Sequence, residues 1–193
     1  MAALLAASLF VSCGAKDLTE DEVKEIVSPL IDKSYKINVI FFGEGLPGDE
    51  SEAVEYDETQ YDVKPVSYIT VLSGEFKNID QLKEAASEVY SSDYLGNVFK
   101  LAFEGMTDDK GEIYQYPRYI ESYSGELKII GGAKDESIVT GRTYDVSTLK
   151  ITSQTSKYVF FTVESYIDGN DAGPVDLSIK LDEAGWRLDS PTY

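Results

Sequence analysis

The hydrophobic pattern of this 193-residue chain changes its period once, near residue 113. Before that point apolar residues recur mainly at helical spacing. After it they alternate with polar residues, which is typical of strands that bury one face. Helices followed by a long run of strands are typical of an α+β domain, in which helices cover one face of an antiparallel sheet. We therefore expect an α+β fold with N-terminal helices packed on a curved antiparallel sheet.

Three helices are predicted, and the first begins at Thr19, because Thr19 and Glu22 form the sequence pattern of a capping box. Its apolar stripe contains Pro29, which lacks an N–H and is expected to kink or divide the helix. Residues 37–42 either extend this helix or begin a strand, because periodicity cannot separate the two over so few residues. The other two helices are predicted at residues 79–89 and from residue 91 to a stop at Gly105.

One strand is predicted before the change of period, at residues 66–72, and the others follow it. Residues 49–62 contain seven carboxylates and no basic residue, so their mutual repulsion predicts a loop. The later strands are predicted at residues 116–123, 126–130, 143–151, 157–167 and 175–181, with a last strand that carries Trp186 and Leu188.

The charge of the chain restricts its partners. It has 35 Asp and Glu against 17 Lys and Arg, a formal net charge of −18. Such a field repels phosphate backbones and anionic lipid headgroups, so we expect no nucleic-acid partner. Basic proteins, cell-wall polymers and divalent cations stay open as partners, and high acidity also serves solubility by itself.

The chain contains no histidine. Histidine is the commonest general base and the commonest metal ligand, so Ser-His-Asp triads, Cys-His dyads and histidine-based zinc sites are excluded for this chain. An enzyme built from it would depend on carboxylates, tyrosine, lysine or a hydroxyl nucleophile. We expect no catalytic residue, no metal and no cofactor.

The single cysteine, Cys13, ends an apolar block, MAALLAASLFVSC, at the start of the chain. This pattern is typical of a bacterial lipoprotein signal, in which the cysteine is lipidated and becomes the new N-terminus. The block is shorter than the roughly 20 apolar residues that span a membrane. We therefore expect a signal at 1–12, lipidated Cys13 with its tether at 13–18, and one α+β domain at 19–193, held outside the cytoplasm by acyl chains.

Gly43-x-Gly45-x-x-Gly48 follows an apolar run and matches the spacing of a dinucleotide-binding turn. Such a turn must open a helix that carries the pyrophosphate at its N-terminus. Here Pro47 lacks a backbone donor, and the acidic segment that follows would repel the phosphates. We interpret the glycines as a stop and turn after the first helix, and we expect no bound nucleotide.

Two kinds of surface are candidate partner sites. Arg118 and Arg142 lie beside tyrosines, and in so acidic a chain each is a local positive centre suited to a carboxylate on a peptide or wall polymer. The acidic run suits a cation or a basic partner. The alternatives are ordinary surface ion pairs for the arginines and a solvated charge run for the carboxylates. The candidate partner-binding residues are Tyr116, Arg118, Arg142, Asp49, Glu50 and Glu52.

Three segments, LKEAASEVYSSDY at 82–94, GELKIIGG at 125–132 and GWRLDSPTY at 185–193, carry a resemblance together with the order of elements. The chain resembles small extracytoplasmic lipoproteins of Gram-positive bacteria with a cystatin-like, or nuclear-transport-factor-2-like, α+β fold. It is most similar to the secreted inhibitors of peptidoglycan DL-endopeptidases. The resemblance implies a protein that binds and blocks a cell-wall hydrolase, with Trp186 packed in its core.

The leading interpretation is a lipid-anchored, extracytoplasmic, non-catalytic binding protein that inhibits or modulates cell-wall hydrolases. One alternative is a small-ligand-binding protein or enzyme in which a tyrosine and a buried carboxylate act in a cone-shaped pocket. Another is a passive structural lipoprotein of the envelope. A pocket carboxylate of strongly raised pKa would favour the enzyme, whereas exposed tyrosines on a filled domain would favour the binding protein.

Overall fold

The structure, a computed structural model, describes residues 17–56, 66–111, 113–131 and 141–193. It has the mixed helix and sheet content of an α+β protein. Cys13 lies outside the described residues. No helix in the described ranges is long and apolar enough to cross a bilayer.

The first helix, α1 (Glu20–Phe41), begins at the predicted capping box. The backbone N–H of Thr19 donates to the Glu22 carboxylate at 2.7 Å, and the N–H of Glu22 donates to the Thr19 hydroxyl at 3.3 Å. Pro29 lies inside this one helix, so of the two expected alternatives, a kink or a division, the division is wrong. Proline has no N–H, so Pro29 donates no hydrogen bond to the carbonyl of Glu25 one turn earlier. Glu25 is exposed, so water can supply the missing hydrogen bond. Residues 37–41 extend the helix.

The next two helices, α2 (Ile79–Ser87) and α3 (Ser92–Phe99), confirm the prediction. Each has a polar cap, since Asn78 accepts from the N–H of Gln81 at 2.9 Å and Ser91 accepts from that of Tyr94 at 3.2 Å. A π-helical turn, η1 (Lys100–Glu104), continues α3 and ends at Gly105, which has a φ of 75°.

The strands form three antiparallel sheets, which differs from the one curved sheet that we expected. The first has the order β1 (Gly48–Tyr56), β2 (Val66–Val71), β6 (Leu127–Ile130) and β5 (Tyr119–Glu121). The second is a meander with the order β10 (Gly185–Leu188), β9 (Asn170–Asp182), β8 (Tyr158–Ile167) and β7 (Arg142–Gln154). The third pairs β3 (Met106–Thr107) with β4 (Ile113–Gln115).

Two sequence predictions about these strands need correction. Residues 49–56 belong to strand β1 rather than to a loop, because β2 supplies their backbone partners, with Val54 opposite Tyr68. The rest of the predicted loop, from residue 57, lies outside the described residues. The strand predicted at residues 116–123 is shorter, since β5 begins only after Pro117, which has no N–H to donate to a sheet.

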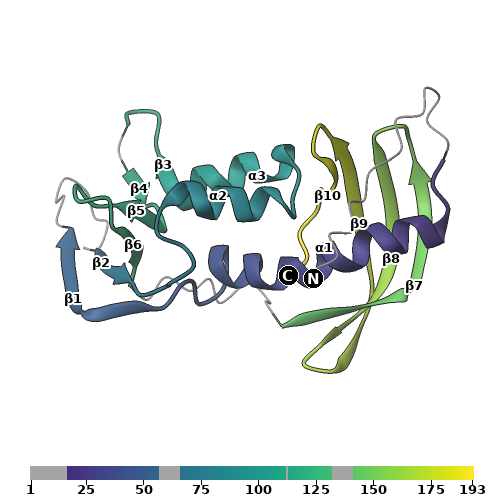
Figure 1. The fold of residues 1–193 in the computed structure, drawn as a ribbon, viewed down its shortest axis with the longest axis horizontal. Helices are drawn as coiled ribbons and strands as arrows, with labels where there is room; N and C mark the ends of the chain where they lie inside the picture. Colours follow the sequence, from purple (N-terminus) through teal and green to yellow (C-terminus); the bar gives the residue numbers. More distant parts are fainter. Residues whose placement is uncertain (1–16, 57–65, 112, 132–140) are drawn as a thin grey trace, which may run out of the picture.

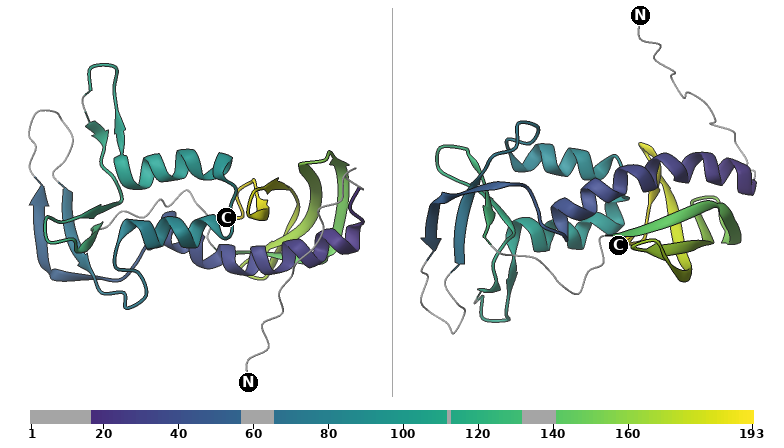
Figure 2. Two further views of the ribbon diagram at one scale, coloured as in Figure 1. Left: turned by 45° about the horizontal axis from the view of Figure 1, so that its top comes forward. Right: turned by 90° about the horizontal axis from the view of Figure 1, so that it is seen from below.

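Figure 1 shows α1 lying along the long axis of the molecule, between the meander and the first sheet. The first half of α1 crosses one face of the meander, and α2 and α3 lie beside its second half, as the two views in Figure 2 confirm. The buried side chains form one hydrophobic cluster that includes Ile31 of α1, Leu82 of α2 and Phe161 of β8. Trp186 is half-buried and packs against this cluster.

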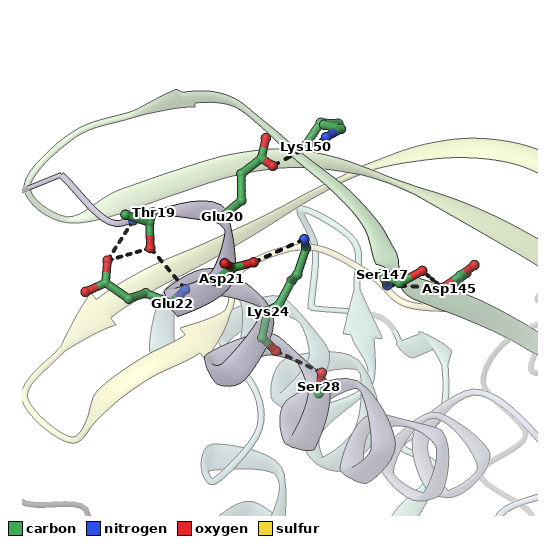
Figure 3. A network of polar contacts seen from close by, with 9 residues as sticks. All are labelled: Thr19, Glu20, Asp21, Glu22, Lys24, Ser28, Asp145, Ser147 and Lys150. Carbon is green, nitrogen blue, oxygen red and sulfur yellow. Dashed lines mark hydrogen bonds and ion pairs between the residues drawn. The ribbon is translucent and has the colours of Figure 1, made fainter.

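Polar contacts fix the start of α1 beside the meander (Figure 3). Lys150 of β7 forms an ion pair with Glu20 at 3.4 Å. The side chain of Gln154 closes the same end by accepting from the backbone N–H of Leu18 at 2.9 Å and donating to its carbonyl at 3.2 Å. The helix is therefore held to the edge strand of the meander as well as to the core.

Candidate functional site

Arg118 bonds the C-terminal end of α1. Its Nε donates to the carbonyl oxygen of Ile40 at 3.0 Å and its Nη2 to that of Gly43 at 2.5 Å. The neighbouring Tyr119 hydroxyl donates to the same Ile40 carbonyl at 2.8 Å and accepts from the N–H of Leu46 at 3.1 Å. These carbonyls lack partners within the helix and lie at the negative end of its dipole. Arg118 therefore joins β5 to α1 within its own chain.

The glycines of the dinucleotide-like motif serve packing against the first sheet. Gly45 has a φ of 81°, and a Cβ there would lie 2.3 Å from Cδ1 of Ile129 on β6. A Cβ at Gly48 would lie 2.4 Å from Cδ1 of Ile69 on β2. The motif thus brings the turn after α1 into close contact with two strands, in agreement with its interpretation as a stop and turn.

The other predicted partner-binding residues lie on different sheets and do not converge. Asp49 and Glu50 lie on β1, an edge of the first sheet, whereas Arg142 lies on β7, an edge of the meander, where it donates to the Ser165 hydroxyl at 2.7 Å. Hydrogen bonds from the hydroxyl and N–H of Ser51 lower the pKa of Asp49. Tyr116 is half-buried between β4 and β5. Glu52 lies on β1, with its side chain outside the described part.

A buried polar network that the sequence analysis missed lies against the middle of α1. The Asn38 amide donates to the carbonyl and hydroxyl of Thr192 at 3.2 and 2.9 Å and accepts from the Tyr90 hydroxyl at 2.7 Å. The Thr192 hydroxyl donates to that of Ser34 at 2.8 Å. Ser34 and Asn38 are four residues apart on an apolar helix face, and this spacing was the available signal.

Two tyrosines beside this network have buried hydroxyls without a partner among the described residues, Tyr94 and Tyr144. The Tyr94 ring stacks on that of Tyr90 at a centroid distance of 4.7 Å. Burial raises the pKa of both Tyr94 and Tyr144 and raises that of Tyr90 to about 12. These three side chains are therefore neutral at physiological pH.

The enzyme alternative requires a carboxylate of raised pKa beside such a tyrosine. Within the described ranges, every carboxylate pKa that is shifted is lowered: that of Asp49 by Ser51, that of Glu88 by Lys33 and that of Asp93 by Lys180. The described residues also contain no group of three acidic or cysteine side chains placed to hold a metal ion. Among the described residues, the buried tyrosines that the enzyme alternative needs are therefore present, but a carboxylate of raised pKa beside them is not.

We predict that the fold is lost at alkaline pH as these tyrosines ionise. Burial raises their pKa above the value of about 10 in the unfolded chain, so the folded state binds protons more tightly. The resulting stability is present below pH 10 and is lost as the pH rises toward the folded pKa, about 12 for Tyr90. Ultraviolet absorbance of tyrosinate and circular dichroism, followed together, should show late ionisation that coincides with unfolding. Complete ionisation near pH 10 in a folded chain would contradict this.

An aromatic pair with one exposed ring and one half-buried ring, Phe160 and Tyr158, lies on the meander, on the face away from α1. Phe160 of β8 is 43% exposed, and its ring lies 6.2 Å from that of Tyr158 with an interplanar angle of 15°. The Lys180 ammonium group lies 5.6 Å from the centre of the Tyr158 ring and forms an ion pair with Asp93 at the start of α3. Hydrogen bonding to Asp93 raises the pKa of Lys180. We call Tyr158, Phe160 and Lys180 the aromatic strip.

The aromatic strip is the described feature most suited to contact with another molecule, because the predicted arginine sites bond to the chain itself. The chemistry available on it is apolar contact, cation–π attraction and charge pairing. Searches of protein-family models, curated proteins and solved structures found no match to this chain.

Proposed function

We propose that this chain is a non-catalytic binding protein that acts outside the cytoplasm by contact with another protein. The observation that carries the proposal is the aromatic strip, where the exposed ring of Phe160 lies beside the half-buried ring of Tyr158 on the outer face of β8. Aromatic residues are enriched in protein–protein interfaces, so an exposed ring beside a second ring is a candidate contact surface.

The proposed location rests on the signal pattern that ends at Cys13. Lipid on this residue would hold the domain at a membrane surface. The expected result is that the full chain sediments with membranes and that Cys13→Ser moves it to the soluble fraction. Equal sedimentation of the two chains would argue against the anchor.

The proposed partner class is a cell-wall hydrolase of the DL-endopeptidase kind, and the domain is proposed to be cystatin-like. Support for the fold comes from α1, which lies across a four-stranded antiparallel meander. Support for the partner comes from the sequence resemblance and from the net charge of −18, which favours encounter with a basic protein.

A cell-wall digestion assay tests the proposed function. The full chain with Cys13→Ser is added to purified cell wall and a DL-endopeptidase from the same organism. We expect slower digestion with a saturable dose response. The heat-unfolded chain, which has the same charge but no assembled surface, should not slow the reaction. No inhibition by the folded chain, or equal inhibition by the unfolded one, would reject the proposal.

A further inference from the structure

We infer that the outer face of the meander, centred on Phe160, docks a basic segment of a partner protein. This inference rests on the proposed function, because it names the surface through which the binding protein would act. It is carried by three observations on that face: an exposed ring, a cation already held on the neighbouring ring, and carboxylates without a cation.

The strand register defines the outer face. Val159, Phe161 and Val163 of β8 are buried and point toward α1, so the alternate residues point away from it. Residues directly opposite each other on neighbouring strands share a face. The outer face therefore also contains Lys180, opposite Tyr158, Asp176, opposite Thr162, and Asp145, opposite Glu164.

One half of this face already holds a cation. The ammonium group of Lys180 lies over the Tyr158 ring and pairs with Asp93, which lowers the pKa of that carboxyl. An aromatic face and a carboxylate together form a favourable site for an ammonium or guanidinium group. The arrangement shows how a basic side chain is accommodated on this sheet.

The other half has the same kinds of group without the cation. Phe160 is exposed, and the described residues make no ion pair with the carboxylates of Glu164 or Asp176. Two further basic residues of the described chain share this face: Lys150 pairs with Glu20 at the start of α1 (Figure 3), and Arg187, opposite Lys180, donates to the carbonyl oxygen of Ser87. Asp145 and Glu164 lie opposite each other on adjacent strands, a like-charge arrangement that disfavours folding and that a cationic partner would relieve.

The chemistry of the face selects among classes of partner. Nucleic acids and anionic lipid headgroups would meet uncompensated carboxylates, and a free metal ion would gain nothing from the exposed ring. A protein segment that alternates basic and apolar side chains satisfies both features, because one lysine or arginine can lie over Phe160 while another reaches Glu164, four residues further along β8.

The test uses a fluorescent peptide of four Arg-Leu repeats and the full chain with Cys13→Ser, at about 0.15 M salt, where long-range attraction is screened. We expect Glu164→Gln with Asp176→Asn to weaken binding about tenfold. The matched pair Glu84→Gln with Asp109→Asn removes the same charge from exposed positions elsewhere and should change binding less than about twofold. Equal weakening of peptide binding by the two double substitutions would show that only the net charge of the chain matters, and it would overturn the inference.

The aromatic contribution has its own matched variants. Phe160→Ser should weaken peptide binding about tenfold, whereas Tyr123→Ser, at a fully exposed ring in the turn between β5 and β6, should leave it unchanged. Thermal unfolding of each variant verifies that it is folded. Unchanged binding by Phe160→Ser would also overturn the inference.

The same variants separate this inference from the proposed function. If wild type and Phe160→Ser slow cell-wall digestion equally, the function stands and this surface is rejected. If wild type does not slow digestion but the peptide results are as expected, the endopeptidase is rejected as partner and the docking surface stands.

Discussion

Gly45→Ala is expected to lower the free energy of unfolding by about 2–4 kcal/mol. Gly45 has a φ of 81°, a region that side-chain-bearing residues occupy only at a cost. The new Cβ would also lie 2.3 Å from the Ile129 side chain, 2.9 Å from Nη2 of Arg118 and 3.2 Å from the Tyr119 hydroxyl. Arg118 and Tyr119 hydrogen-bond to the end of α1, so moving them aside disturbs the junction between α1 and the first sheet.

Gly96→Ala is the matched control for this substitution. Gly96 lies inside α3, is exposed, and has nothing within 4 Å of an added Cβ. Alanine has a higher helix propensity than glycine, so this change should raise the free energy of unfolding by about 0.5–1 kcal/mol. Denaturant unfolding of the two variants measures both effects. A neutral Gly45→Ala would contradict the packing role assigned to the motif.

Asn38→Ala is the second substitution with a large expected effect, a loss of about 2–4 kcal/mol. The Asn38 side chain is buried and bonds Tyr90 and both the backbone and side chain of Thr192. After its removal these buried polar groups lack some of their hydrogen bonds, and water cannot reach them to replace those bonds. A buried polar group without a hydrogen-bond partner lowers the free energy of unfolding. The loss exceeds the small gain in helix propensity.

Asn97→Ala is the control, because Asn97 is also in a helix but is exposed. It should change the free energy of unfolding by less than about 0.5 kcal/mol. Alkaline unfolding should also begin at lower pH in Asn38→Ala, because less stability remains to offset the ionisation of the buried tyrosines. Equal stability of the two variants would show that the network does not hold the C-terminal segment to α1.

Local signals in the sequence predicted the local parts of the fold. Thr19 and Glu22 marked the start of α1, and the alternation of Val175, Leu177 and Ile179 marked the buried face of β9. Each of these signals depends on residues a few positions apart, whose geometry the backbone itself determines. The structure therefore agrees with the α+β class, all three helices and the strands of the meander.

The errors concern contacts between distant parts of the chain. Strand β1 was predicted as a loop, because its charge repulsion is visible in the sequence and its pairing with β2 is not. The Asn38–Thr192 contact joins residues 154 positions apart, and no periodicity indicates such a pairing. Arg118 was expected to face a partner, but the carbonyls at the end of α1 lie within its reach.

The central proposal is that this chain works by binding a cell-wall DL-endopeptidase. Calorimetric titration of the full Cys13→Ser chain into a purified DL-endopeptidase from the same organism tests it most directly, at low and at physiological salt. We predict saturable binding at both salt concentrations, weaker at the higher one because the acidic surface assists association. The absence of binding at both concentrations would contradict the claim.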